Sequence, residues 1–299
     1  GCLRLIETMQ YFAMKRIVFV IESLHLGGAE KSLVTLLKFM DYEKYDVTLI
    51  LFRQGGVFRE EVPKEVNCIE MNYPRLSFQE RILFYLRRKF LRKKHDAQLL
   101  WPMIEGKIPF NSDTYDIAVA YNQGFATYFV SSFVHAIEKF AWLNIDYREA
   151  GYNIVYDYPF YENFKSIVAV SAQARDGLTS ELNGINKSIS ILEIKDITDP
   201  FDVWRKADLP SRVSFKEEVI NIVSVGRLAK QKGFHLAVAA CRNLLDKGHQ
   251  VNWYVVGEGG ERTYLERLIR KEKLEKDFFL IGADSNPYPY MRNATIYVQ

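Results

Sequence analysis

Short, continuous apolar runs alternate with segments of helical period along this chain. The runs fall at 17–21, 47–52, 117–121, 140–143 and 167–170 in the first half, and at 219–225, 251–256, 278–281 and 296–298 in the second. Continuous apolar runs are typical of strands buried on both faces of a parallel sheet, and the helical segments between them supply the crossovers. The sequence therefore predicts an α/β fold with two Rossmann-like, doubly wound domains. We expect the second domain to be incomplete, because four strands are found where about six are usual.

Length and composition agree with two domains. The chain has 299 residues, of which 48% are hydrophobic, enough to fill two cores. Prolines and charges gather near 192–210, which predicts an N-terminal domain at 14–195 and a C-terminal one at 196–299. The net charge of +3 is too small for a dedicated nucleic-acid binder.

The cysteine pattern and the hydropathy of the sequence bear on where in the cell the protein works. The three cysteines lie far apart and no Cys/His cluster occurs, which argues against structural zinc and disulfides and favours a reduced, cytoplasmic location. No apolar run is long enough to span a membrane. Met14 precedes the first strand pattern and the chain stops within another, so we expect upstream residues at 1–13 and truncation after Gln299.

The loop 226–233 is the strongest candidate for binding. It reads Gly-Arg-Leu-Ala-Lys-Gln-Lys-Gly and joins a buried strand to a helix. Cations such as Arg227 and Lys232 beside a helix N-terminus suit a diphosphate, because the backbone N–H groups and the side chains both favour anions. A solvated basic turn remains the alternative.

Two further glycine loops follow strands. Gly257, Glu258 and Gly259 form a Gly-x-Gly that Arg262 prevents from becoming Gly-x-Gly-x-x-Gly, so a tight turn is the simpler interpretation. Gly27 and Gly28 open the first helix, where they serve either ligand approach or packing.

Four blocks in order, at 27–31, 225–233, 255–259 and 286–291, resemble glycosyltransferase family 4. The resemblance is near continuous over 219–299. It implies the two-domain GT-B fold and a retaining enzyme. The implied reaction moves a sugar from a nucleotide-diphosphate sugar, with UDP-sugar favoured, to a glycan or lipid-linked acceptor in bacterial envelope or capsule polysaccharide synthesis. No metal or other cofactor is implied. The residues implied to bind the donor are Gly27, Gly28, Gly226, Arg227, Lys232, Gly257, Glu258 and Gly259.

The resemblance also implies catalytic roles. Arg227 and Lys232 would stabilise the charge on the departing nucleotide, and Asp146 would act on the acceptor side. Asn144 stands where relatives often carry His, and Gln123 where an acidic residue is common. An Asn cannot shuttle a proton near pH 7. Gln123, Asn144 and Asp146 are therefore candidates for acceptor binding, against the alternative that Asn144 and Asp146 only cap a strand end.

The family's Glu-x7-Glu block is absent, so we expect this chain to be inactive alone. An inactive nucleotide-binding relative is one alternative function. An NAD-dependent oxidoreductase is another, although neither glycine loop supplies its full motif.

Residues 81–94 contain seven basic and no acidic side chains, with apolar residues at helical spacing. A basic amphipathic helix suits an anionic membrane surface, here the inner face of the plasma membrane, with a peripherally bound protein. A solvated helix covering the first domain is the alternative.

Overall fold

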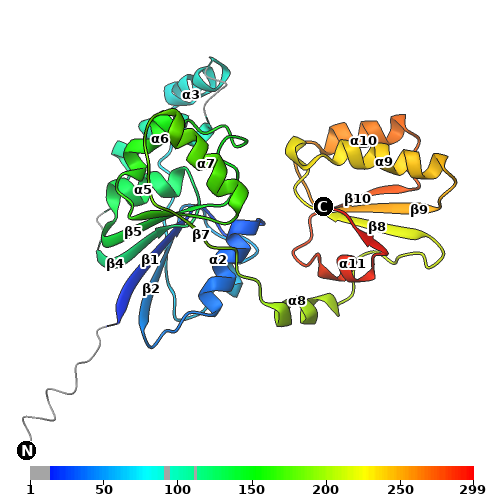
Figure 1. Cartoon of the computed structure of the whole chain (residues 1–299), viewed down its shortest axis with the longest axis horizontal. Helices are drawn as coiled ribbons and strands as arrows, with labels where there is room; N and C mark the ends of the chain where they lie inside the picture. Colours follow the sequence, from blue (N-terminus) through cyan, green and yellow to red (C-terminus); the bar gives the residue numbers. More distant parts are fainter. Residues whose placement is uncertain (1–13, 91–94, 111–112) are drawn as a thin grey trace, which may run out of the picture. The chain divides into compact units, whose positions relative to one another are not determined.

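The structure, a computed structural model, describes residues 14–90, 95–110 and 113–299. The chain divides into two compact units that meet between Thr198 and Asp199 (Figure 1). The sequence predicts this boundary between residues 195 and 196. The segment that follows, with its prolines and charges, forms helix α8 (Pro200–Ala207) of the second unit.

The first unit is built on a seven-stranded parallel sheet in the order β3-β2-β1-β4-β5-β6-β7. Its strands are β1 (Lys15–Ile21), β2 (Tyr45–Leu51), β3 (Asn67–Glu70), β4 (Thr114–Ala120), β5 (His135–Leu143), β6 (Ser166–Ala169) and β7 (Ile191–Glu193). Its helices are α2 (Gly28–Lys38), α3 (Phe78–Phe90), α4 (Asp96–Ile104), α5 (Phe125–Phe133), α6 (Ile154–Tyr161) and α7 (Ala172–Gly184). The strand order reverses between β1 and β4, which places the ligand-binding edge of such a sheet at the loops after these two strands.

The position of strand β1, covered on both faces of the sheet, explains why residues 17–21 are continuously apolar. Val18 and Val20 enter a core shared with α4 to α7, whereas Phe19 and Ile21 enter a second core shared with α2. Successive side chains of a strand point to opposite faces, so a strand covered on both sides needs apolar residues at every position.

All nine predicted strands are present, and two were missed. The missed strands, β3 and β7, are only four and three residues long and lie at the two edges of the sheet. Strands β4 and β5 begin earlier than predicted, at Thr114 and His135. The first residues of β5 are partly exposed and include Glu138 and Lys139, so the apolar pattern starts late.

The second unit has a four-stranded parallel sheet in the order β10-β9-β8-β11. Its strands are β8 (Ile220–Val225), β9 (Val251–Val256), β10 (Phe278–Gly282) and β11 (Ile296–Tyr297), and its other helices are α9 (Phe234–Asp246), α10 (Arg262–Lys271) and α11 (Tyr288–Asn293). Helices α9 and α10 cover one face of the sheet and α11 the other (Figure 1). Here the order reverses at β8, the strand that precedes the basic loop.

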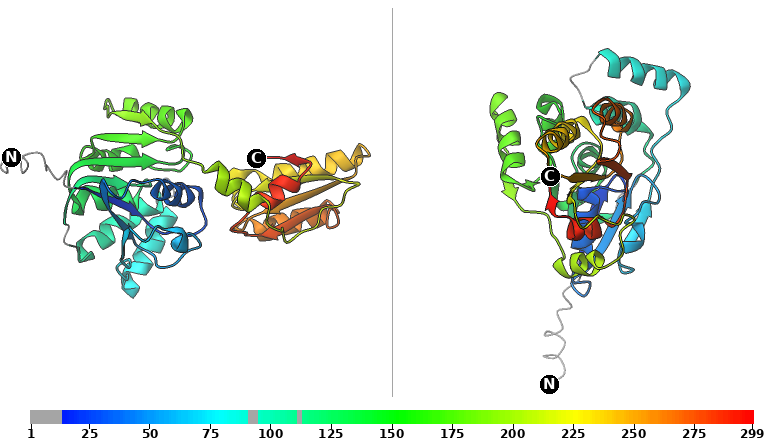
Figure 2. Two further views of the ribbon diagram at one scale, coloured as in Figure 1. Left: turned by 90° about the horizontal axis from the view of Figure 1, so that it is seen from below. Right: turned by 90° about the vertical axis from the view of Figure 1, so that its right-hand side faces the viewer.

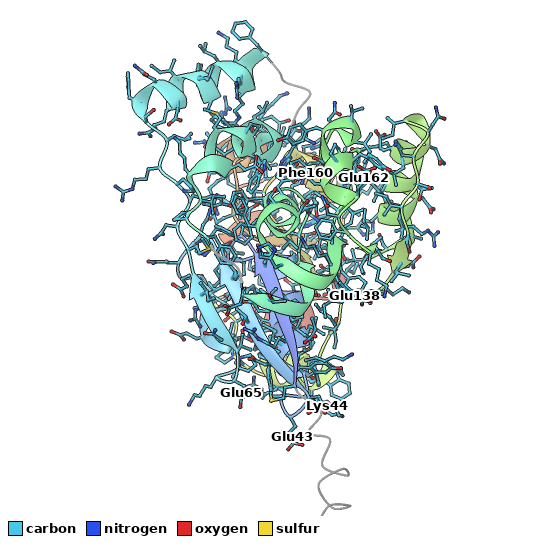
Figure 3. All side chains as sticks on the ribbon, turned by 90° about the vertical axis from the view of Figure 1, so that its left-hand side faces the viewer. Glu43, Lys44, Glu65, Glu138, Phe160 and Glu162 are labelled. Carbon is cyan, nitrogen blue, oxygen red and sulfur yellow. The ribbon has the colours of Figure 1, made fainter. Side chains whose placement is uncertain are left out.

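Figure 2 gives two further views of the ribbon, and Figure 3 draws the side chains as sticks. Glu43, Lys44 and Glu65 lie at the end of the first unit where β2 and β3 begin (Figure 3). Helix α3 stands at the opposite end, toward which β1 runs (Figures 1 and 3). None of the helices within the described ranges combines the length and the apolar content that a membrane span requires.

A buried carboxylate fixes the loop after β5. Asp157 accepts hydrogen bonds from the Tyr128 hydroxyl at 2.6 Å, from the Gln98 amide at 2.7 Å and from the Tyr147 hydroxyl. Gln98 also exchanges two hydrogen bonds with the backbone of Asn153. Helices α4, α5 and α6 therefore hold both ends of the 147–153 segment, next to the predicted acceptor residues.

We expect Asp157→Asn to change how stability depends on pH. Burial raises the pKa of Asp157, and its hydrogen bonds only partly oppose this. The native chain therefore keeps this proton to a higher pH than the unfolded chain does, so stabilisation present at low pH is lost as the pH rises through the raised pKa. The free energy of unfolding of the variant, minus that of the native chain, should therefore rise between about pH 4 and about pH 7 by on the order of 1 kcal/mol.

Urea unfolding at several pH values measures this difference. The matched control is Asp246→Asn on α9, which removes an exposed carboxylate that pairs with Arg242. A difference between D157N and native chain that stays constant with pH would contradict the assignment.

Candidate functional site

The basic loop follows β8, at the point where the strand order of the second unit reverses. After Gly226 the chain runs through Arg227 to a 3₁₀ turn, Lys230–Lys232, and Gly233 then precedes α9 with a φ of +68°. Glycine adopts this left-handed conformation without the steric cost that a side chain brings. The turn therefore delivers its cations directly at the start of a helix, whose first N–H groups lack partners within the helix.

The three cations of this loop are available to a ligand. Arg227, Lys230 and Lys232 are exposed, and within the described ranges none of them forms an ion pair. Other arginines of the same unit behave differently: Arg242 pairs with Asp246, and Arg262 pairs with Glu258 and Glu266. Positive charge without a protein counter-ion, beside a helix N-terminus, is the arrangement that binds phosphate groups.

The loop after β9 packs backbone to backbone against the basic loop. Gly226 N–H donates to Val256 O at 3.0 Å, and Leu228 N–H donates to Glu258 O at 2.9 Å. A Cβ at Gly257 would lie 1.9 Å from Gly226 O, and one at Gly259 would lie 2.4 Å from Leu228 O. Both glycines therefore allow the close approach that shapes the basic loop, a role different from direct contact with a ligand.

Glu258 lies between these glycines, and its carboxylate is paired with a neighbouring arginine. Its carboxylate accepts hydrogen bonds from Arg262 at 2.6 and 2.8 Å, and this hydrogen bonding is the main cause of its lowered pKa. Arg262, which breaks the dinucleotide motif in the sequence, thus begins α10 and anchors the loop.

Adjacent glycines of this loop provide a matched test of the close packing. Gly259→Ala should lower the free energy of unfolding by more than about 1 kcal/mol, because its Cβ would overlap the backbone of Leu228. Gly260→Ala is the control, since nothing lies within 4 Å of a Cβ there. Urea unfolding followed by circular dichroism compares the two, and equal stabilities would contradict the described contact.

The glycine loop of the first unit follows β1, again at the reversal of strand order. Gly27 is extended, with φ −170°, and precedes α2. A Cβ at Gly27 would meet the flexible Glu30 carboxylate, whereas nothing lies within 4 Å of one at Gly28. Space beside the backbone is thus open at Gly28. The nearby cation Lys31 is paired with Glu61 at 3.3 Å, so this loop lacks the unpaired charge of its counterpart.

The three predicted acceptor residues lie at the ends of neighbouring strands β4 and β5. Asn144 N–H donates to Gln123 Oε1 at 3.2 Å, and its side chain donates to Tyr121 O at 2.7 Å. Asp146 Oδ1 accepts from the N–H groups of Arg148 and Glu149. The structure therefore brings Gln123 and Asn144 together and gives Asp146 a role in the shape of its own turn.

Sequence reasoning missed a polar group at the same edge of the first unit. The Tyr73 hydroxyl donates to Glu22 Oε2 at 2.6 Å, and Arg53 lies over the Tyr73 ring. The usable signal was the position of Arg53, directly after the apolar run that forms β2. Tyr73 gave no signal, because it follows the missed strand β3.

Within the described ranges, no three His, Cys, Asp or Glu side chains are placed to share a metal ion. Tyr147 and Tyr161, which flank the buried Asp157, lie in the core of the first unit.

The basic segment 81–94 is described only to Phe90, so the cations at 91–94 lie outside the described residues. The described part belongs to α3, which has no buried residue.

Comparisons with known proteins agree with this geometry. Residues 206–299 match the family model "Glycosyl transferases group 1". An N-acetylgalactosamine-N,N'-diacetylbacillosaminyl-diphospho-undecaprenol 4-alpha-N-acetylgalactosaminyltransferase of Campylobacter jejuni is 26% identical over 284 residues, covering 93% of this chain and 72% of the relative. An uncharacterized glycosyltransferase of Methanocaldococcus jannaschii is 22% identical over 157 residues, covering 51% of this chain and 38% of the relative.

Among solved structures, HepE from Anabaena in complex with UDP and glucose superposes with a TM-score of 0.61 at 15% identity, covering 95% of this chain and 73% of HepE. The chain thus spans nearly three quarters of the Campylobacter relative and about two fifths of the Methanocaldococcus relative. It has the two Rossmann-like domains of the GT-B fold, and the part that matches the group 1 glycosyl transferase model contains the basic loop.

Proposed function

We propose that the chain is part of a retaining glycosyltransferase of family 4 type, which moves a sugar from a UDP-sugar to a glycan or lipid-linked acceptor in bacterial envelope or capsule polysaccharide synthesis. The observation that carries the proposal is the loop after β8, where Arg227, Lys230 and Lys232 stand unpaired among the described residues at the reversal of strand order.

The donor diphosphate would bind at this loop. Arg227 and Lys232 would hold its oxygens together with backbone N–H groups at the start of α9. As the bond to the sugar breaks, negative charge grows on the departing UDP, and cations already in place stabilise it without reorganisation. The side chains of the loop would therefore stabilise the charge on the departing diphosphate, as a metal ion does in other enzymes.

Two of the similar proteins support the choice of donor and acceptor. HepE was solved in complex with UDP and glucose, and the Campylobacter relative is named for transfer to a diphospho-undecaprenol glycan. The dinucleotide alternative gains nothing from the geometry, because Arg262 and its ion pair with Glu258 occupy the place of the third glycine.

On the acceptor side, we assign Asp146 the contact with the acceptor hydroxyl. Its Oδ1 accepts two backbone N–H groups, and its Oδ2 has no hydrogen bond within the described ranges. Gln123 and Asn144 would position the acceptor beside it. Because Asn144 cannot take up a proton, the leaving phosphate would accept the proton of the acceptor hydroxyl.

Loss of Arg227 should weaken nucleotide binding. Arg227→Ala should raise the dissociation constant for UDP about 10- to 100-fold, the effect of a lost hydrogen bond between charged groups. Isothermal titration calorimetry with UDP measures it on this chain.

Arg242→Gln is the matched control. It removes one positive charge from α9, but at a residue already paired with Asp246. UDP affinity that falls equally in both variants would reduce the effect to net charge, and unchanged affinity in Arg227→Ala would remove the loop from the donor site.

We further propose that α3 binds an anionic membrane surface, which would bring a lipid-linked acceptor to the protein at the inner face of the plasma membrane. Large apolar side chains stand exposed along the helix, with Phe78 77% and Phe90 75% accessible. Arg81, Arg87 and Lys89 have no ion pair among the described residues, whereas Arg88 pairs with Asp96. Exposed apolar residues combined with unpaired cations match an anionic lipid surface better than water.

Neutralising these cations should release the protein from vesicles. Each cation near an anionic surface contributes about 1 kcal/mol, so Arg81→Gln, Arg87→Gln and Lys89→Gln together should reduce partitioning on the order of 100-fold. Sedimentation with vesicles containing phosphatidylglycerol measures it. The control combines Lys64→Gln, Lys216→Gln and Lys247→Gln, and equal binding of both triple variants would end the proposal.

A further inference from the structure

A cavity of about 540 Å³ opens at the carboxyl ends of β2 and β3 in the first unit. It is lined by Phe52, Arg53, Gln54, Asn72, Tyr73 and Arg75. These residues come from the loops that follow the two strands, at the end of the sheet where parallel α/β folds bind ligands. Its volume lies within the range of small-molecule sites.

The cavity combines cations and amides with an aromatic wall. Arg53 and Arg75 are exposed and have no ion pair within the described ranges, while nearby Arg59 is paired with Glu70 at 2.8 Å. The amide groups of Gln54 and Asn72 can donate further hydrogen bonds. Two guanidinium groups with neighbouring amide donors form a lining suited to a carboxylate or phosphate.

The wall of the cavity is held in place from β1. The Tyr73 ring packs at 5.6 Å from Phe52 and 4.5 Å from Phe125, and the Arg53 guanidinium lies 5.6 Å from its centroid. The Tyr73 hydroxyl donates to Glu22 at 2.6 Å, and burial, with the nearby Glu22 charge, raises the Tyr73 pKa so that the hydroxyl stays protonated. Glu22 directly follows β1, so this contact links the cavity to the strand whose loop carries Gly27 and Gly28.

We propose that this cavity recognises an oxyanion on the acceptor, a carboxylate or phosphate attached to a sugar-sized group, through Arg53 and Arg75. This assignment deepens the proposed function and rests on it, because only that function makes the bound molecule a glycosyl acceptor. The donor diphosphate is met by the loop of the other unit, so the charge here serves a different group. The partly exposed ring of Tyr73, backed by the buried Phe52, offers a flat surface for a sugar ring, and the two arginines select against neutral glycans.

Nuclear magnetic resonance titration of the chain tests the assignment directly. The probes are glucuronic acid, glucose 1-phosphate and glucose, and the reporters are the side-chain amides of Gln54 and Asn72. We expect the two charged probes to shift these signals and glucose to leave them unchanged. The tighter of the charged probes then identifies whether carboxylate or phosphate is the preferred group.

Variants assign the effect to the two arginines. Arg53→Gln combined with Arg75→Gln should weaken the charged probes at least tenfold and leave UDP binding unchanged. Lys44→Gln combined with Lys64→Gln removes the same charge near the amino ends of β2 and β3 and should weaken nothing (Figure 3). Glucose binding as well as the charged probes, or the double arginine variant binding them undiminished, would overturn the proposal. UDP titrated separately keeps failure of the donor site distinct from failure of this cavity.

Discussion

Close contact between two loop backbones shapes the second unit. The carbonyl of Gly226 lies where a side chain at 257 would have to be, and the backbone of Leu228 lies where one at 259 would be. Backbone hydrogen bonds between the loops replace the side chains that these glycines lack. The basic loop is thereby held from behind, which leaves Arg227 and Lys232 directed toward solvent without a protein counter-ion among the described residues.

The two units use the same local design with different charge. In each, the strand at the reversal of order, β1 or β8, leads through a glycine loop into a helix. In the second unit the loop cations have no ion pair with any residue that the structure describes, whereas Lys31 of the first is neutralised by Glu61. The first unit instead gathers amides and aromatic rings, with its unpaired arginines one and two strands away. This division suits a donor diphosphate on one unit and an acceptor on the other.

Much of this could be predicted from the sequence, for a physical reason. Strands covered on both faces must be apolar throughout, so β1, β8 and β9 were visible, and so were the loops directly after them. The edge strands β3 and β7 were hidden, because runs of four and three residues are too short to show a pattern. Because β3 was missed, the cavity was missed as well: only the position of β3 shows that Tyr73 and Arg75 lie at the carboxyl end of a strand. The glycines at 257 and 259 were found, but their contact with the basic loop could not be predicted, because it joins two separate loops and has no sequence pattern. Asp146 was found as well, although hydrogen bonds to its own turn leave only Oδ2 for an acceptor.

Amide chemical shifts of the labelled chain on addition of UDP test the central assignment most directly. The account predicts that the largest shifts fall on 226–233 and on 257–259, which packs against it, with the first unit unaffected. Saturable shifts centred on the loop after β1, or no saturable shifts at millimolar UDP, would contradict the assignment of the diphosphate site to the loop after β8.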